Sequence, residues 1–127
     1  MSDPELVLDI LSSILIAIER IERRFQGIGE PDDFVVSDEG IDRLDGIAMM
    51  LIAIGEQVKR LDGATESNLD VAYPEIDWKG VKGMRDILSH HYFSADAEII
   101  FDVCQNKISD LKRVVLLLQT QYSGKLQ

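Results

Sequence analysis

The chain has 127 residues, of which 46% are hydrophobic and 28% are charged, and its formal net charge is −10. This composition is typical of one globular domain and excludes an intrinsically disordered chain. Cys104 is the only cysteine, which excludes an intramolecular disulfide and fits a reducing cytoplasm. The first ten residues lack the basic start of a signal peptide, and every apolar stretch is too short to span a bilayer. We therefore expect one cytoplasmic domain over residues 1–127, without a membrane partner.

The first two predicted helices are long and amphipathic. The first begins after Asp3, a residue suited to capping, with Pro4 at its first position, and it ends before Gly27. Its apolar residues recur at three- and four-residue steps: Leu6, Val7, Ile10, Leu11, Ile14, Ile18, Ile21 and Phe25. Ser37 is the expected cap of the second helix, and Gly63 is expected to close it. Its apolar stripe has the spacing of a bundle seam: Ile41, Leu44, Ile47, Leu51, Ile54, Val58 and Leu61.

A third and a fourth helix are predicted after a polar loop. The third begins near Trp78 and runs into the segment MRDILSHHYF, residues 84–93. The fourth is capped by Ser94 or Asp96 and ends at residues 123–124. Its predicted apolar face comprises Ile100, Val103, Lys107, Leu111, Val114 and Leu118. Since no segment alternates with period two over a useful length, the predicted fold class is all-α, a bundle of four main helices.

The negative charge is unevenly distributed. Between residues 30 and 45, seven acidic residues stand against one arginine, whereas between residues 78 and 92 three cations stand against one acid. The total charge argues against a nucleic-acid partner, because phosphate binding usually needs a basic surface. The second segment is nevertheless a local basic island, and it contains both histidines of the protein.

The segment MRDILSHHYF holds the best candidates for catalysis. Arg85 offers forked cationic donors suited to a phosphate, and His90 can exchange a proton near neutral pH. Together they supply a base for a 2′-hydroxyl and a cation for the charge that builds on phosphorus, which is what metal-free cleavage of RNA requires. His91 is a second candidate base. Asp86 could orient a histidine or the arginine, and Tyr92 could donate a hydrogen bond or be modified.

Helical geometry makes a site within one chain awkward. Arg85 and His90 are five residues apart, so their side chains differ by about 140° around a straight helix. Either the helix ends or distorts near His90, or a second copy of the segment faces the first across a dimer. We favour the dimer with some distortion. The plainer interpretation is a solvated arginine followed by a histidine pair that caps a helix C-terminus.

Other chemistries have little support in the sequence. Neighbouring histidines diverge on a helix, and neither HExxH nor CxxC spacing is present, so we expect no metal site. Cys104 is expected to be a small buried hydrophobe. Glycine-rich phosphate loops are also missing, and no cofactor is predicted.

Four short motifs follow one another in a distinctive order. I-G-E at Ile54–Glu56 is followed by Lys59, Y-P-E-I-D-W occupies Tyr73–Trp78, and G-M-R at residues 83–85 leads into R-D-I-L-S-H-H-Y. The last motif fits the pattern R-x4-H-x-Y. From about residue 33 to about residue 102, the chain resembles HepT-like toxins, which belong to the HEPN superfamily of helical ribonucleases.

The resemblance implies an up-and-down helical bundle that dimerises, with two motifs meeting in a cleft. It implies a metal-independent endoribonuclease toxin of a type II toxin–antitoxin system, acting on RNA, with tRNA as the expected class, and not on DNA. By position, Arg85 and His90 are the catalytic pair, and His91 has a supporting part. A minimal nucleotidyltransferase (MNT) antitoxin transfers AMP to the motif tyrosine, here Tyr92, and silences the toxin. Asp86 stands where the family usually has asparagine, and it could pair with Arg85 or orient His90.

Two other functions remain compatible with the sequence. In one, the chain is a non-catalytic helical subunit that binds and presents nucleotide or substrate to a nucleotidyltransferase. In the other, it is a structural dimer in which changes at Arg85, His90 and Tyr92 affect stability alone. Toxicity on expression would separate the ribonuclease from both.

Overall fold

The structure is a computed structural model that describes residues 3–66, 68–91 and 96–126, with their side chains except those of residues 89–91 and 96. Over these ranges it contains helices and no strand, so the predicted all-α class is confirmed. The elements are α1 (Pro4–Phe25), the 3-10 helix η1 (Pro31–Phe34), α2 (Asp38–Ala64), α3 (Leu69–Ala72), α4 (Trp78–Lys82), α5 (Met84–His91), α6 (Asp96–Asn106) and α7 (Ile108–Gly124). Among the described helices, none combines the length and the apolar character that crossing a membrane requires.

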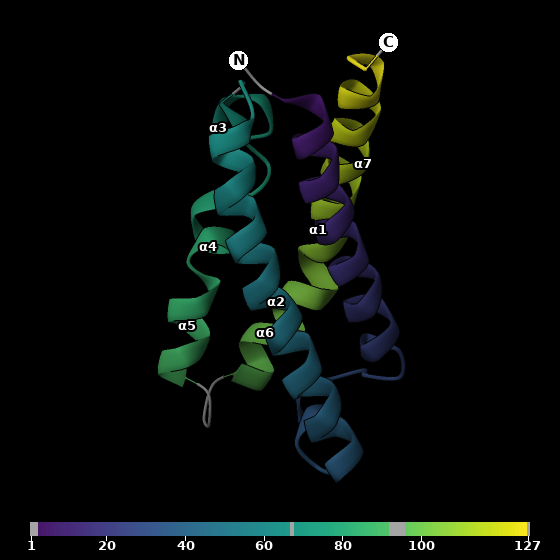
Figure 1. Cartoon of the computed structure of the whole chain (residues 1–127). Helices are drawn as coiled ribbons and strands as arrows, with labels where there is room; N and C mark the ends of the chain where they lie inside the picture. Colours follow the sequence, from purple (N-terminus) through teal and green to yellow (C-terminus); the bar gives the residue numbers. More distant parts are fainter. Residues whose placement is uncertain (1–2, 67, 92–95, 127) are drawn as a thin grey trace.

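The helices run up and down around α2, which lies at the centre of the bundle (Figure 1). Helix α1 packs along one side of α2, α4 and α5 pack along another, and α7 lies beside α1. The start of α1 and the end of α7 lie at the same end of the bundle. The core between the helices is mainly aliphatic and includes Ile10, Ile14, Ile18, Ile47, Ile54 and Leu61, each at most 1% exposed, together with the buried aromatic residues Phe34, Trp78 and Tyr122. The predicted up-and-down bundle is confirmed.

The predicted starts of the first two helices are confirmed by their hydrogen bonds. The carboxylate of Asp3 accepts from the first backbone N–H groups of α1, and the Ser37 hydroxyl accepts from Gly40 N–H at 3.0 Å. Such caps satisfy donors that have no partner inside the helix. At the other end of α1, Gly27 has φ +84°, a conformation that favours glycine and turns the chain towards η1. Helix α2 continues through Gly63 to Ala64, so the prediction that Gly63 closes it was wrong by one residue.

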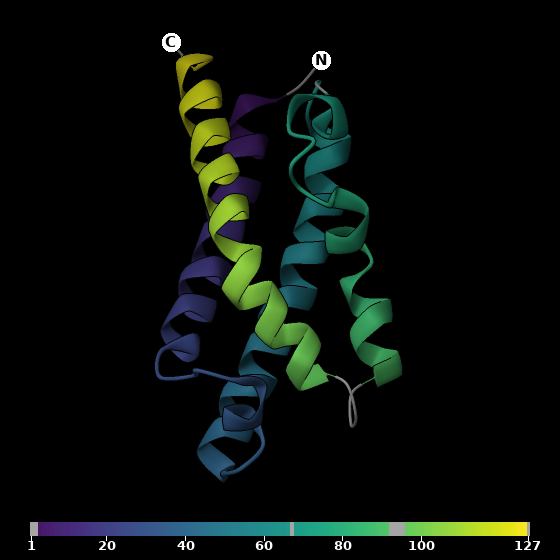
Figure 2. The ribbon, with the colours of Figure 1, turned by 180° about the vertical axis from the view of Figure 1, so that it is seen from behind.

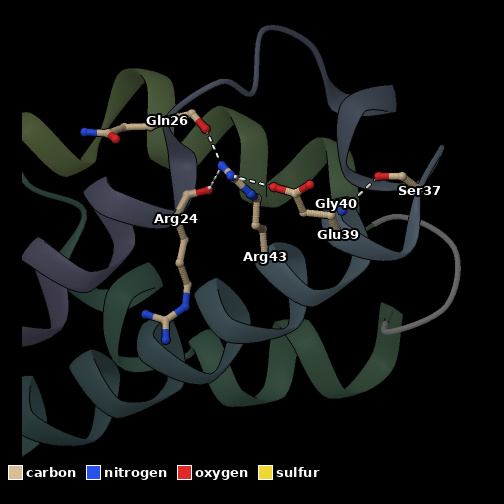
Figure 3. A network of polar contacts seen from close by, with 6 residues as sticks. All are labelled: Arg24, Gln26, Ser37, Glu39, Gly40 and Arg43. Atoms are coloured by element: carbon tan, nitrogen blue, oxygen red, sulfur yellow. Dashed lines mark hydrogen bonds and ion pairs between the residues drawn. The ribbon is translucent and has the colours of Figure 1, made fainter.

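Arg43 ties the start of α2 to the end of α1 (Figure 3). Its guanidinium donates to the backbone carbonyls of Arg24, at 3.3 Å, and of Gln26, and to the Glu39 carboxylate at 2.9 Å. The last carbonyls of a helix lack partners within that helix, and a cation suits the negative end of the helix dipole. The single arginine of the acidic stretch is therefore used to close a helix junction.

The predicted third helix is two helices, α4 and α5, which are separated by Gly83. Gly83 N–H donates to the Lys79 carbonyl at 3.0 Å and so caps α4. Trp78 and Met84 are buried, at 2% and 7% exposed. On one continuous helix these two residues would point about 120° apart, because they are six positions apart. The break lets both side chains enter the core beside α2.

The predicted fourth helix is also two helices, α6 and α7, with a bend at Lys107 (Figure 2). Backbone hydrogen bonds continue on both sides, from Lys107 N–H to Val103 and from Leu111 N–H to Lys107. Helix α6 packs on η1 and α2, whereas α7 packs mainly on α1. Because of the bend, the α6 part of the apolar stripe packs on η1 and α2, and the α7 part packs on α1. Helix α6 begins at Asp96, and the alternative cap, Ser94, lies outside the described residues.

The apolar stripes are buried along most of their predicted length and open at their ends. Leu6 is 39% exposed and Ile41 is 40% exposed, while Phe25, Leu44 and Val103 are partly buried against the core. Lys107 belongs to the bend, and its side chain is 59% exposed, so its predicted place on a packed face was wrong. The remaining predicted stripe residues are buried: Val7, Ile10, Leu11, Ile14, Ile18, Ile21, Ile47, Leu51, Ile54, Val58, Leu61, Ile100, Leu111, Val114 and Leu118.

Candidate functional site

Arg85 lies in the first turn of α5 and points away from the core. Met84 and Leu88, four residues apart on one face, are 7% and 1% exposed and anchor α5 to the core. Arg85 follows Met84, about 100° further around the helix, and its side chain is 62% exposed. The anchoring of α5 therefore leaves this guanidinium available at the surface.

A carboxylate from α2 holds the guanidinium of Arg85. Arg85 Nε donates to Glu56 Oε1 at 2.9 Å, and Lys59 Nζ lies 3.6 Å from the other oxygen of that carboxylate. The hydrogen bond from Arg85 lowers the pKa of Glu56 below its ordinary value, and the charge of Lys59 lowers it further. Glu56 is therefore a carboxylate at neutral pH, shared between two cations from different elements.

Each of the three residues of I-G-E has its own structural role. Ile54 is 1% exposed in the core. A Cβ at Gly55 would lie 2.6 Å from the backbone carbonyl oxygen of Val81, so α2 and α4 approach more closely than any larger residue permits. This close approach brings the next residue, Glu56, within reach of α5. Sequence reasoning recognised the motif but missed Glu56 as a site residue, although its position beside the glycine was a usable signal.

The motif Y-P-E-I-D-W fixes the start of the α4–α5 segment. Trp78 is buried and donates its indole N–H to the Tyr73 carbonyl at 2.9 Å. Asp77 accepts from Gly80 N–H at 3.0 Å and so caps α4. Glu75 binds Arg113 of α7 at 2.9 Å, which ties this segment to the other side of the bundle. The motif is therefore structural, and it determines where α4 begins.

Carboxylates of α2 form ion pairs with most cations of the predicted basic island. Lys82 pairs with Asp62, and this hydrogen bond raises the pKa of Lys82. Arg85 pairs with Glu56, which also attracts Lys59. The segment is basic in sequence, but in three dimensions its cations alternate with acids from the neighbouring helix. Such a surface binds phosphate through particular directed donors more than through net charge.

Of the other predicted site residues, Asp86 lies in the first turn of α5, and the remaining three lie at or beyond its end. The backbones of His90 and His91 belong to its last described turn, and their side chains lie outside the described residues. Tyr92 lies outside them altogether. Asp86 is exposed, next to Arg85. The structure thus places Arg85, Glu56 and Lys59 together, and it brings the backbone of His90 to the same short helix.

Cys104 is unsuited to nucleophilic chemistry. It lies on α6, partly buried against the core, and burial raises the pKa of its thiol to about 12. At neutral pH it is a thiol and not the reactive thiolate. Within residues 3–66, 68–91 and 96–126, no group of three or more histidine, cysteine or acidic side chains is placed to hold a metal ion.

Comparison with known proteins agrees with the class that the fold and motifs indicate, that of helical ribonucleases. A family model described as "Ribonuclease HepT-like" matches residues 14–118. The chain therefore belongs to the HepT-like ribonuclease family. The match extends beyond residues 33–102, where the motifs lie, and includes most of α1 and of α7.

Curated relatives carry names of the same kind. The protein named "Putative RNase TTE0752", from Caldanaerobacter subterraneus subsp. tengcongensis, is 31% identical over 105 residues, which cover 83% of this chain and 87% of the relative. "Putative RNase MJ0127", from Methanocaldococcus jannaschii, is 42% identical over 65 residues, half of each chain. "Gamma-glutamylcyclotransferase and putative RNase MJ0434", from the same organism, is 32% identical over 111 residues, which cover 87% of this chain and 46% of the relative. The match thus spans about half the length of these last two relatives, and no solved structure matches significantly.

Proposed function

We propose that this chain is an endoribonuclease that cleaves RNA without a metal ion, with Arg85 and His90 as its catalytic pair. The observation that carries the proposal is the placement of Arg85. It is exposed on a regular helix, five residues before His90, and a carboxylate from a second family motif orients its guanidinium. Membership of a ribonuclease family supports the choice of RNA as substrate.

The proposed reaction uses one proton acceptor and one cation. His90 takes the proton of the 2′-hydroxyl, whose oxygen attacks the adjacent phosphorus while the bond to the 5′-oxygen breaks. The departing 5′-oxygen takes up a proton from water, and the other product ends in a 2′,3′-cyclic phosphate. Arg85 stabilises the charge that builds on the phosphoryl oxygens. Its bond to Glu56 uses Nε, and a guanidinium has four further N–H groups with which to bind a phosphate.

A second copy of the chain is proposed to complete the site. Helix α5 is one α-helix from Met84 to His91, and on such a helix positions 85 and 90 differ by about 140° around the axis. We favour a facing copy of the chain as the way in which the two residues reach one phosphate. In such a homodimer, Arg85 of one subunit approaches the same phosphate as His90 of its partner.

We further propose that the chain, as one HEPN-like domain over residues 1–127, is the cytoplasmic toxin of a toxin–antitoxin pair. Its expected substrate is tRNA. A nucleotidyltransferase antitoxin would transfer AMP to Tyr92, close to Arg85 in sequence. The added phosphates would place negative charge where the RNA phosphate binds, and they would occupy Arg85. Tyr92 is thus the proposed control residue and not a catalytic one, while Asp86 and His91 support the site.

The test is cleavage of tRNA by the purified chain in EDTA. Wild type should cleave, and His90→Ala should not, because the proton acceptor is lost. Arg113→Ala is a matched control, since Arg113 is also exposed and also binds a glutamate at 2.9 Å, but lies on α7. Equal cleavage by wild type and His90→Ala would exclude the proposed mechanism, and loss of cleavage in EDTA that added metal restores would exclude metal independence.

The antitoxin proposal has a separate readout. Co-expression with the cognate nucleotidyltransferase should add one or more AMP masses to wild type and none to Tyr92→Phe. An unchanged mass in the presence of an active partner would contradict it, without bearing on RNA cleavage.

The ion pairs between carboxylates of α2 and cations of the basic island favour a second candidate function. Because Glu56 and Asp62 pair with Arg85 and Lys82, the chain could bind and present a substrate to a nucleotidyltransferase without catalysis of its own. It predicts no growth inhibition when the chain is expressed alone. The ribonuclease predicts inhibition that Arg85→Ala abolishes.

A further inference from the structure

A groove of about 610 Å³ runs between the α4–α5 side of the bundle and the α6–α7 side. Leu51 and Ile54 of α2 lie at its base. Figure 2 shows the helices that carry the lining residues, with α4 and α5 on one side and α6 and the first turns of α7 on the other. Arg85 is not among the described residues that line this groove, so the groove is separate from the guanidinium of the candidate site.

The walls of the groove are apolar and only partly covered. Val81 and Ile87 contribute from one side, and Ile99 and Val103 from the other, all of them half-buried. The core residues beneath them, such as Ile54 and Leu111, are nearly inaccessible. A ligand in the groove would therefore remove partly exposed apolar surface from water, which favours binding.

Acidic side chains surround this apolar floor. Among the described residues that line the groove are five carboxylates, Glu75, Asp77, Glu98, Asp102 and Asp110, and one cation, Lys107. Lys107 lies 3.8 Å from Asp102, and Arg113, outside the groove, binds Glu75 at 2.9 Å. The carboxylates outnumber these cations, so the rim attracts positive charge and repels nucleic acid.

The length of the groove suits a helix. Its α6–α7 side extends from Glu98 to Leu111, which corresponds to about 20 Å at a rise of about 1.5 Å per residue. The opposite side is also helical, and the floor is α2. A helix of about four turns can lie along such a trough with its apolar face inward, the arrangement by which amphipathic helices bind hydrophobic grooves.

We propose that this groove binds an amphipathic helix of a partner protein, with aliphatic residues on one face and lysine or arginine on the flanks of that face. A second copy of this chain is a poorer occupant, because a two-fold contact through the same surface would bring the same five carboxylates against themselves. The inference rests on the groove alone and does not depend on the ribonuclease function.

The test uses a synthetic amphipathic peptide and methyl NMR of the full chain. The peptide has leucine at helical positions i, i+3, i+4 and i+7 and lysine on the flanks, and its control has glutamate in place of each lysine. Methyl signals of Ile76, Ile87 and Ile99, which line the groove, should shift with the lysine peptide. Those of Ile16 and Ile41, which are exposed elsewhere, should not. Fluorescence anisotropy should give binding about tenfold weaker for the glutamate peptide, with a difference that narrows in high salt.

Variants locate the site further. Val103→Gln and Glu98→Gln should each weaken the lysine peptide, the first by loss of apolar contact and the second by loss of charge. Leu116→Gln on the outer face of α7 and Asp42→Asn at the far end of α2 are matched controls and should bind as wild type does. The NMR experiment on wild type needs no substitution, so it still decides the matter if Val103→Gln fails to fold.

Three outcomes would overturn the proposal. They are absence of binding at millimolar peptide, equal binding of the two peptides, and shifts centred on Ile16 or Ile41. A dimer of the wild-type chain that dissociates on Val103→Gln, measured by analytical ultracentrifugation, would show instead that a second copy fills the groove. None of these results bears on tRNA cleavage in EDTA, so the two proposals fail independently.

Discussion

Two arginines join α2 to neighbouring helices, and they differ in the acceptors that they bind. Near its start, Arg43 donates to backbone carbonyls at the end of α1, and its side chain is 32% exposed (Figure 3). Further along α2, Glu56 receives Arg85 of α5, whose side chain is 62% exposed. Arg43 has two main-chain acceptors in addition to the exposed carboxylate of Glu39, whereas the hydrogen bond of Arg85 goes to a partly exposed carboxylate.

The difference between these acceptors separates a structural arginine from a candidate functional one. The carbonyls of Arg24 and Gln26 stay in place as long as α1 is folded, so the bonds from Arg43 are part of the fold. The carboxylate of Glu56 is solvated, and an exposed ion pair contributes little to stability. Its bond to Arg85 therefore adds little to the stability of the fold, and it uses Nε alone, which leaves the other N–H groups of the guanidinium for the proposed phosphate contact.

The largest expected effect is that of Arg85→Ala compared with Arg43→Ala. Arg85→Ala should reduce tRNA cleavage by about 10²–10³-fold, the usual loss when one transition-state donor is removed, and should change thermal stability little. Arg43→Ala should lower the free energy of unfolding by about 1–2 kcal/mol, because it leaves carbonyls without partners. Cleavage by the folded fraction should stay as in wild type. Cleavage rates and thermal denaturation of the same samples check both parts. If Arg85→Ala lost stability and Arg43→Ala lost cleavage, the structural and the functional arginine would be the reverse of those proposed.

Two glycines of α2 provide the next test. Gly55→Ala should destabilise the protein by about 1–3 kcal/mol, because the new methyl group would lie 2.6 Å from the Val81 carbonyl oxygen and push α4 away. Gly63→Ala is the matched control in the same helix, where a Cβ meets nothing within 4 Å. It should stabilise by about 0.5–1 kcal/mol, since alanine favours a helix. Urea denaturation measures both, and equal effects would mean that α2 and α4 do not need the close approach.

The smallest expected effect is on the titration of Glu56. Its pKa is lowered from an ordinary value of 4.5, first by the hydrogen bond from Arg85 and then by Lys59. In Arg85→Ala the pKa should rise towards that ordinary value, which carboxyl NMR can follow. Because the folded pKa is the lower one, the stability that Glu56 contributes is present above pH 4.5 and is lost as the pH falls through the folded pKa. Glu75 is the control, because its pKa is also lowered, by its own backbone hydrogen bond and by Arg113, and should not respond to Arg85→Ala.

The family and the position of Arg85 were predictable because short motifs carry them. The R-x4-H-x-Y pattern identified Arg85, and the family match confirms the kind of protein to which the pattern pointed. Glu56 was quoted as the last letter of I-G-E without a function. Its partner lies 29 residues further along the chain, and no local spacing indicates that the two side chains meet. The catalytic roles of Arg85 and His90 and the modification of Tyr92 stay predictions.

Local sequence determined the helices, their caps and most of their buried stripes, because capping bonds and a period of 3.6 residues act over a few positions. It therefore established an all-α bundle and placed Arg85 on a helix. Tertiary structure decided the breaks at Gly83 and Lys107, since these depend on which neighbour each apolar face must reach. It also decided that carboxylates of α2 match the cations of α4 and α5, and that an acid-rimmed groove opens beside them. Charge can be counted along a chain, but the partner of each charge depends on how the helices pack.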